Sequence, residues 1–172
     1  VAAQKLVRDF DGIPFHFSKE NTSNGCIATV DVIYPTAPFA LVFNPELLRA
    51  ELTPVLQYAA SEYWPHSFAP HDLGTYPLAN GQVYRGGVYT KEQMPIEECG
   101  NMLILVAALT ILDGNADYAR RFWHLFVKWA DYLVSNGYSP DTQLCTDDFA
   151  GPLARNTNLS LKAIIALGAF SR

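Results

Sequence analysis

Two adjacent acids, Asp147 and Asp148, are the residues of this sequence best suited to catalysis, because they interrupt a run of apolar and small side chains. If both carboxylates lie in one cleft, the repulsion between them raises the pKa of one. One acid can then donate a proton while its neighbour acts as a base. The structural alternative is that the two residues make turn contacts and cap the helix that follows. The sequence leaves both interpretations open.

A second polar set, Glu97, Glu98 and Asn101, stands at the start of an apolar run that Pro95 introduces. Carboxylates in the first turn of a helix are stabilised by free backbone N–H groups, which is the structural interpretation of the two glutamates. That interpretation does not account for Asn101, an amide one turn later in an apolar helix. Spacings of three and four residues put Asn101 on the same face as the glutamates. The three side chains could therefore form a binding surface for a polar substrate.

A third set begins with His71 and Asp72, which together could act as an acid–base unit. The alternative is that Asp72 forms an Asx-turn and His71 bonds a neighbouring carbonyl. Asp31 stands among β-branched and apolar residues and needs a partner if it is buried, although a salt-bridged acid in a hairpin is as consistent. Tyr76 is one of several aromatic residues here that could stack on a small polar ligand. We include Asp31, Asp72 and Tyr76 among the candidate substrate-binding residues.

The elements that must position these residues are mostly helices, as the spacing of apolar residues indicates. We expect helices over 45–63, 97–112, 116–134 and 158–170, a helix end over 1–10, a tight turn at 113–115, and loops over 11–36, 66–96 and 139–154. Asn44 and Pro45 suit the cap and first turn of a helix. The helix over 97–112 is apolar on nearly all sides, so we expect burial all round.

Short turns that alternate with long loops indicate stacked helical hairpins. We therefore predict an all-α fold whose helical hairpins form part of an α/α toroid. Loops as long as 66–96 are more often functional than idle. The three polar sets would then lie at the loop ends of successive hairpins.

Composition narrows the classes of function and partner. With 172 residues, of which 49% are hydrophobic, the chain is one domain or a fragment of one, with ample material for a core. The net charge of −5 and the scattered basic residues argue against nucleic acid or an anionic membrane as partner. The longest apolar run, over 102–112, is too short to cross a bilayer. Three widely spaced cysteines and four scattered histidines predict neither a disulfide framework nor a metal site. No phosphate-binding glycine loop is present, and we predict no cofactor.

Several runs of the sequence together form a recognisable pattern. They are Thr29-Val30-Asp31-Val32 with Tyr34-Pro35, Ala69-Pro70-His71-Asp72-Leu73-Gly74-Thr75-Tyr76-Pro77, Met94-Pro95-Ile96-Glu97-Glu98-Cys99-Gly100-Asn101-Met102, Lys128-Trp129-Ala130-Asp131-Tyr132-Leu133, Thr146-Asp147-Asp148-Phe149-Ala150-Gly151 and Asn158-Leu159-Ser160. In this order, and over nearly the whole chain, they resemble the glutaminase A family of bacteria and filamentous fungi. Each run alone is unspecific, whereas the combination is specific.

The resemblance implies that residues 1–172 are a single domain, a fragment of the central helical domain of a longer protein with β-rich domains upstream. It implies an α/α toroid similar to the six-hairpin glycosidases. It also implies hydrolysis of L-glutamine to L-glutamate and ammonia in a secreted or periplasmic protein. The partners would be a small-molecule substrate and other domains of the same protein, with neither nucleic acid nor membrane insertion.

Three hypotheses for the function remain open. In amide hydrolysis, Asp147, Asp148 and Glu97 or Glu98 would be the acid and base, while Asn101 and His71 orient the substrate. A fainter similarity to retaining β-glucosidases of the glucosylceramidase type implies glycoside hydrolysis, with Asp147 or Asp148 as acid/base and no counterpart of the nucleophile. The third hypothesis is a non-catalytic domain that binds a small polar ligand.

Overall fold

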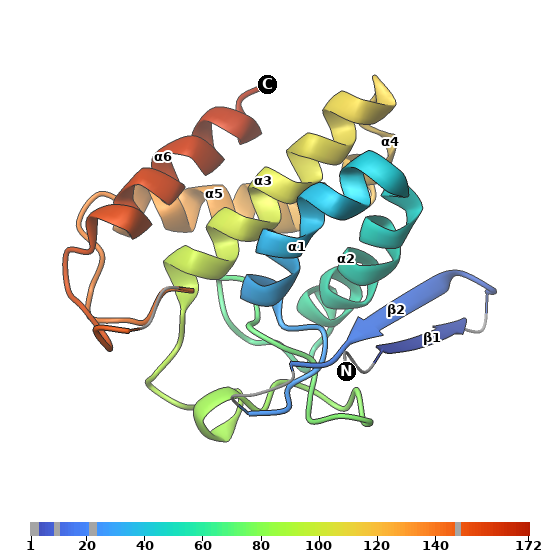
Figure 1. Ribbon diagram of the computed structural model, residues 1–172. Coiled ribbons are helices and arrows are strands. Elements are labelled where there is room, and N and C mark those ends of the chain that lie inside the picture. The colour runs from blue at the N-terminus through green and yellow to red at the C-terminus, as the bar shows by residue number, and fades with distance from the viewer. Residues whose placement is uncertain (1–3, 9–10, 21–23, 147–148) are drawn as a thin grey trace. The chain divides into compact units, whose positions relative to one another are not determined.

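The computed structural model describes residues 4–8, 11–20, 24–146 and 149–172 (Figure 1). The chain divides into two compact units, residues 1–64 with 70–91 and residues 65–69 with 92–172. The first unit contains strands β1 (Gln4–Arg8) and β2 (Pro14–Ser18), helices α1 (Val30–Phe43) and α2 (Pro45–Ala60), and the short 3-10 helix η1 (Tyr84–Gly86). The second unit contains helices α3 (Pro95–Asp113), α4 (Asp117–Arg120), α5 (Trp123–Asn136) and α6 (Thr157–Phe170).

In the first unit, β1 and β2 form an antiparallel hairpin in which Gln4 pairs with Ser18 and Arg8 with Pro14. The prediction of a helix end over 1–10 is therefore wrong at residues 4–8, and its other residues lie outside the described part of the chain. Local periodicity could not reveal the strand, because β1 depends on hydrogen bonds to a partner strand that follows it in the chain. The strand β2 packs on α2, and His16 Nδ1 lies 3.0 Å from Glu51 Oε1.

Helix α1 begins at Val30, within the segment 11–36 that we expected to be a loop. That expectation is wrong from Val30 onward, and it is also wrong at β2 (Pro14–Ser18). Pro35 and Pro38 lie inside the helix, where each removes a backbone donor and disfavours helix. The buried positions Val30, Ile33, Ala37 and Ala40 recur at helical spacing, and α1 packs on α2. Burial of this stripe offsets the cost of the prolines.

Helix α2 confirms the predicted helix that Pro45 begins, although it ends at Ala60 rather than at 63. Asn44 occupies the cap position, but its side chain makes no capping hydrogen bond. Asn44 is therefore at the predicted cap position, but the prediction that its side chain caps the helix is wrong.

In the second unit, α3 packs on α5 and α6 and contributes several apolar residues to the core. Its N-terminal half is buried, whereas Ile111 and Leu112 are 73% and 53% exposed, so the prediction of burial all round is wrong at its end. Gly114 then adopts a left-handed conformation and ends the helix, which confirms the predicted turn. Although α3 is long and apolar enough to span a membrane, 67% of its most apolar 18-residue stretch is buried, as in a core helix.

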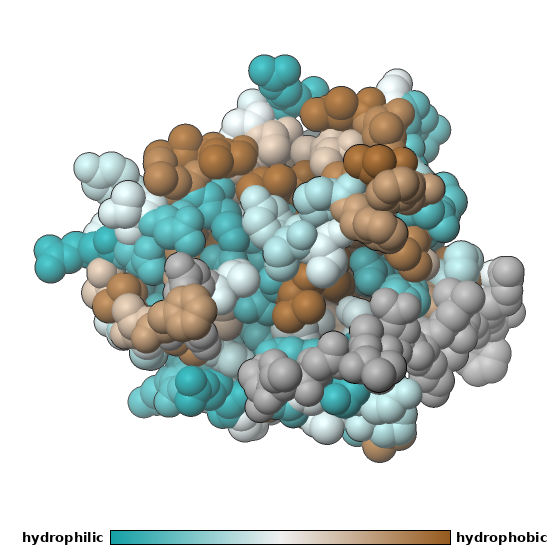
Figure 2. All heavy atoms as spheres, in the orientation of Figure 1, coloured by the Kyte–Doolittle hydropathy of each residue, from teal (hydrophilic) through white to brown (hydrophobic). Residues whose placement is uncertain are grey.

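The predicted helix over 116–134 is divided into α4 and α5 near Phe122. Its apolar stripe is confirmed, because Phe122, Phe126, Trp129 and Leu133 are all buried. Helix α6 packs on α3 and α5, and Asn156 caps it by accepting the Asn158 N–H at 2.9 Å. The outer face of α6 exposes Leu161, Ile164 and Ile165, and apolar side chains gather along this helix in Figure 2.

The mostly helical architecture confirms the all-α prediction. Among the described residues, the β1–β2 hairpin is the only sheet. The polar sets of the sequence lie at the start of α3, at the start of α1 and in the long segment that follows α2.

Candidate functional site: two buried polar clusters

The structure divides the candidate site residues between the two units. The second unit brings Glu97, Glu98 and Asn101 together. The first unit brings Asp31, His71 and Asp72 together and also contains Tyr76. Asp147 and Asp148 lie outside the described residues.

The start of α3 fixes the glutamates of the second unit. Pro95 occupies the first turn, and the free N–H of Ile96 donates to Gln143 Oε1 at 3.0 Å. Glu97 and Glu98 follow in that first turn, where the helix dipole favours negative charge. Both side chains are fully buried, at 0% exposure, so they require hydrogen-bond partners inside the protein.

Asn101 joins the two glutamates, as the spacing predicts. Its Nδ2 donates to Glu97 Oε1 at 3.4 Å and to Glu98 Oε2 at 3.1 Å. Asn101 is also fully buried. One amide group therefore holds two carboxylates that the helix places next to one another.

Lys162, on α6, is the residue of this cluster that we did not predict. Its Nζ donates to Glu97 Oε1 and, at 2.7 Å, to Asn101 Oδ1. It is the one charged residue in the sequence of α6 and falls on the same stripe as the buried Leu159 and Ala166. A single charge on a buried helical stripe is a signal that could have identified it, because such a charge needs an opposite partner.

Close packing holds the stem of Lys162 against α3. A Cβ atom at Gly100 would lie 2.6 Å from Lys162 Cγ, so only glycine leaves room for the lysine. On another side, the hydroxyl of Thr146 donates to Glu97 Oε1. We call Glu97, Glu98, Asn101, Thr146 and Lys162 the α3–α6 cluster.

The hydrogen bonds of Glu97 are distributed unevenly. Its Oε1 accepts from Asn101, Thr146 and Lys162. Its Oε2 is buried and has no hydrogen-bond partner among the described residues. A buried acceptor without a donor is rare in proteins, and this oxygen is therefore a candidate for contact with a ligand.

In the first unit, both carboxylate oxygens of Asp72 accept hydrogen bonds. Its Oδ1 accepts the N–H groups of Gly74 at 2.9 Å and Val83 at 3.0 Å. Its Oδ2 accepts the Tyr84 N–H at 3.0 Å and lies 3.0 Å from His71 Nδ1. The bond to Gly74 is the Asx-turn that the structural interpretation of Asp72 predicts.

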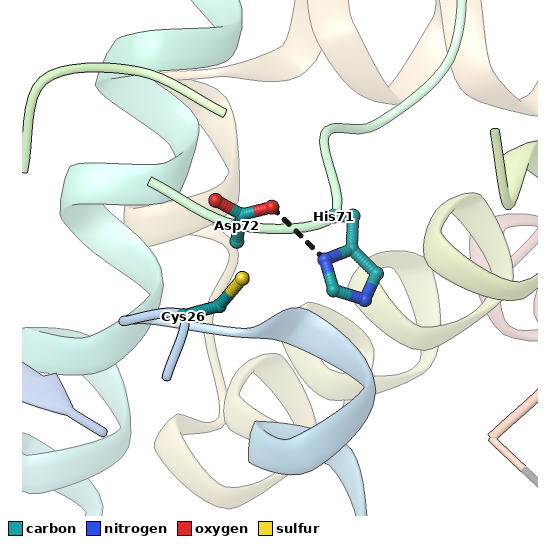
Figure 3. Close-up of side chains that lie close together, drawn as sticks. All are labelled: Cys26, His71 and Asp72. Carbon is teal, nitrogen blue, oxygen red and sulfur yellow. Dashed lines mark hydrogen bonds and ion pairs between the residues drawn. The ribbon is translucent and has the colours of Figure 1, made fainter. Parts of the chain in front are cut away.

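Cys26, His71 and Asp72 have ligand atoms within 4.8 Å of one another, and we tested whether they fit a metal. In Figure 3 the Cys26 thiol is directed at Asp72, and His71 Nδ1 faces the same carboxylate. Burial, and then the charge of Asp72, raises the pKa of Cys26 to about 12, so the protonated thiol is favoured. Because both oxygens of Asp72 already accept hydrogen bonds, the set suits a structural anchor better than a metal site.

The second ring nitrogen of His71, Nε2, lies near Asp31. Its Nε2 lies 3.7 Å from Asp31 Oδ1, and its ring stacks on Tyr84 with 4.0 Å between centroids. Asp31 is in the first turn of α1, so the alternative prediction that it belongs to a hairpin is wrong. Burial, and then the charge of Asp31, raises the pKa of Glu20, whose Oε2 accepts from the Thr29 hydroxyl at 3.5 Å. We did not predict Glu20, since it stands in a segment without periodicity.

The segment after α2 contains one further feature, a pocket of about 440 Å³. It is lined by Tyr58, Tyr63, Ala79, Asn80, Gly81, Gln82 and Val88. Gln82 connects this pocket to the histidine, because its Oε1 accepts the His71 N–H at 2.7 Å. Tyr76 is half-buried in the same segment, and its N–H donates to Gly25 O at 3.0 Å.

Gly74 explains part of the run that contains His71 and Asp72. It has a φ of +140°, and a Cβ atom there would lie 2.2 Å from the carbonyl oxygen of Leu78. Any other residue would therefore force the backbone apart. In the run His71-Asp72-Leu73-Gly74, the hydrogen bonds of Asp72 and the close approach at Gly74 fix the backbone of the segment after α2.

Comparison with known proteins identifies the family. The model of the glutaminase A six helical-hairpin domain matches residues 1–172. Glutaminase A of Aspergillus oryzae is 43% identical over 159 residues, which cover 92% of this chain and 22% of that protein. A probable glutaminase of Arthroderma benhamiae is 33% identical, over 92% of this chain and 24% of its own length. The chain spans about a quarter of the length of these relatives, and it belongs to the glutaminase A family as part of its six helical-hairpin domain.

Proposed function

We propose that this chain is part of a hydrolase that converts L-glutamine and water to L-glutamate and ammonia. The observation that carries the proposal is the 43% identity, over 92% of this chain, to a protein named glutaminase A. The α3–α6 cluster supports it, because buried carboxylates beside a cation and an amide are the kind of group that enzymes use on polar substrates. We further propose that the protein acts outside the cytoplasm, together with other domains of the same chain.

The reaction requires one base and one acid. The base takes a proton from water as the water oxygen bonds to the amide carbon of glutamine. The carbon–nitrogen bond then breaks, and the acid gives its proton to the departing nitrogen, which leaves as ammonia. We draw the base and the acid from Asp147, Asp148, Glu97 and Glu98.

Residues of the first unit have a supporting part in this proposal. Asp72 fixes the ring of His71 through Nδ1, which leaves Nε2 directed at Asp31. A carboxylate that orients a histidine in this way sets which nitrogen carries the proton. We assign His71, Asp31 and Tyr76 to orientation of the substrate, and Asp72 to support of His71.

The experiment that tests the proposal uses the full-length protein that contains this chain. Release of ammonia from L-glutamine is compared with release of nitrophenol from aryl glycosides. We expect ammonia only, and we expect Asp148→Asn or Glu98→Gln to lower kcat about 100-fold or more if that residue is the acid or base. Asp117→Asn is the control, because Asp117 is exposed and pairs only locally with Arg120.

Two results would contradict the proposal. Release of nitrophenol without ammonia would favour a glycosidase. Neither activity, with no effect of Asp148→Asn on ligand binding, would favour a non-catalytic domain. For the isolated 172-residue chain we expect little or no turnover.

A further inference from the structure

In the α3–α6 cluster, Glu97 Oε2 is a buried oxygen that receives no hydrogen bond from the described residues. The other oxygen of the same carboxylate, Oε1, accepts hydrogen bonds from three donors. Glu97 is 0% exposed, and bulk solvent therefore does not satisfy this oxygen. The group that completes the cluster must bring an N–H or an O–H.

The charge of the cluster indicates which donor it would select. Lys162 donates to Oε1 of the buried Glu97 carboxylate, whereas Oε2 of the same carboxylate receives no hydrogen bond from the described residues. In a buried setting a carboxylate oxygen attracts a cation much more strongly than it would in water. A primary ammonium group supplies both the positive charge and the N–H donors.

Thr146 shows the side from which a ligand can approach. Its hydroxyl donates to Glu97, while the residue itself is exposed. Thr146, in the loop between α5 and α6, is therefore the exposed member of the cluster and marks its side nearest to solvent.

We propose that Glu97 Oε2 binds the α-ammonium group of an amino-acid substrate, and that Lys162 is the positioning residue that directs this oxygen toward it. The proposal rests on the proposed function, since glutamine has an α-ammonium group in addition to the amide that reacts. It narrows the role of Glu97 to substrate recognition and leaves the acid and base to the other carboxylates.

Lys162 acts through two contacts. By donating to Glu97 Oε1 it keeps that oxygen occupied and turns Oε2 away from the lysine. By donating to Asn101 Oδ1 it sets the orientation of the amide, whose Nδ2 then holds both glutamates. Removal of the lysine would release both constraints at once.

The test measures binding by calorimetry in the full-length protein, with L-glutamate and glutarate as probes. The two probes differ by the α-ammonium group. We expect the natural protein to prefer glutamate, and Glu97→Gln to weaken glutamate binding about 10- to 100-fold, the range for one hydrogen bond to a charged group. Binding of glutarate should change little.

Two further variants keep the result interpretable. The double variant Glu97→Gln/Lys162→Met removes both charges of the buried pair together, which avoids an uncompensated charge, and should show the same loss of preference. Glu51→Gln is the matched control, because Glu51 is a buried glutamate of the first unit that pairs with His16. Its preference for glutamate should equal that of the natural protein.

The inference is overturned if Glu97→Gln weakens both probes equally, or if the natural protein does not distinguish them. A preference that Glu97 controls, in a protein that releases no ammonia from glutamine, would support the ammonium site and refute the proposed reaction. Ammonia release with no such preference would do the reverse.

Discussion

Glu20 and Glu97 are both acids in confined surroundings, but their partners differ. Glu97 has a buried lysine beside it. Glu20 has Asp31 nearby, whose negative charge adds to the effect of burial and raises the pKa of Glu20 above its ordinary value of 4.5. The thiols of Cys26 and Cys99 are likewise held in the protonated form, since burial raises the pKa of both. Neither cysteine is therefore suited to act as a nucleophile.

The raised pKa of Glu20 makes stability depend on pH in a defined direction. Below 4.5 the carboxyl is protonated in both the folded and the unfolded chain, so it imposes no penalty. As the pH rises from 4.5 through the raised pKa, the unfolded chain loses the proton first, and the free energy of unfolding falls. We expect Glu20→Gln to remove this fall, measured by urea unfolding at a series of pH values. Identical pH profiles for the variant and the natural protein would contradict the assignment.

At the scale of single elements, α3 and α6 each contain a glycine, and the two differ in how closely other atoms approach them. Gly100 on α3 is covered by the stem of Lys162, whereas a Cβ atom at Gly168 on α6 would meet nothing within 4 Å. Alanine favours helix over glycine by up to about 1 kcal/mol. The sign of the change should therefore depend on whether a lysine lies over the position.

We expect Gly100→Ala to lower the free energy of unfolding by about 1–3 kcal/mol, because overpacking outweighs the gain in helix propensity. Gly168→Ala is the control and should raise it by up to about 1 kcal/mol. Chemical unfolding of both variants provides the comparison. Stabilisation by Gly100→Ala would show that Lys162 does not occupy the place that the structure gives it.

The sequence predicted the elements whose signal is local and missed those whose stability comes from elsewhere. Helix α2 has clear apolar periodicity, α3 and α6 are continuous apolar segments, and Pro45 and Gly114 mark two of the helix ends. Helix α1 was hidden by two internal prolines, and β1 has no signal apart from its partner strand. Such elements are stabilised by tertiary contacts that override local propensity.

The candidate site was predicted in the same uneven way. Glu97, Glu98 and Asn101 could be grouped because they share one helix face, and the structure confirms their contacts. Lys162 could not be paired with them, since 65 residues separate it from Glu97 in the chain. For Asp72, the structure supports the structural alternative, because its hydrogen bonds to Gly74, Val83 and Tyr84 fix a loop that no local pattern defines.

At the scale of the whole molecule, the family resemblance predicted what the residues alone could not. The predicted family is confirmed, and the helical architecture agrees with it. Six hairpins contain twelve helices, whereas the described residues contain six α-helices, α1 to α6. We therefore propose that further hairpins of the same domain complete the toroid and cover apolar residues such as Leu161, Ile164 and Ile165, which α6 exposes.

The most direct test of the account is a crystal structure of the full-length protein with L-glutamate bound. We predict that the ligand contacts the α3–α6 cluster, with its α-ammonium nitrogen within hydrogen-bond distance of Glu97 Oε2. The same structure would show whether Asp147 and Asp148 face the side-chain carboxylate of the product. Glutamate bound in the pocket between Tyr58 and Tyr63, with Glu97 Oε2 satisfied by water alone, would contradict the account.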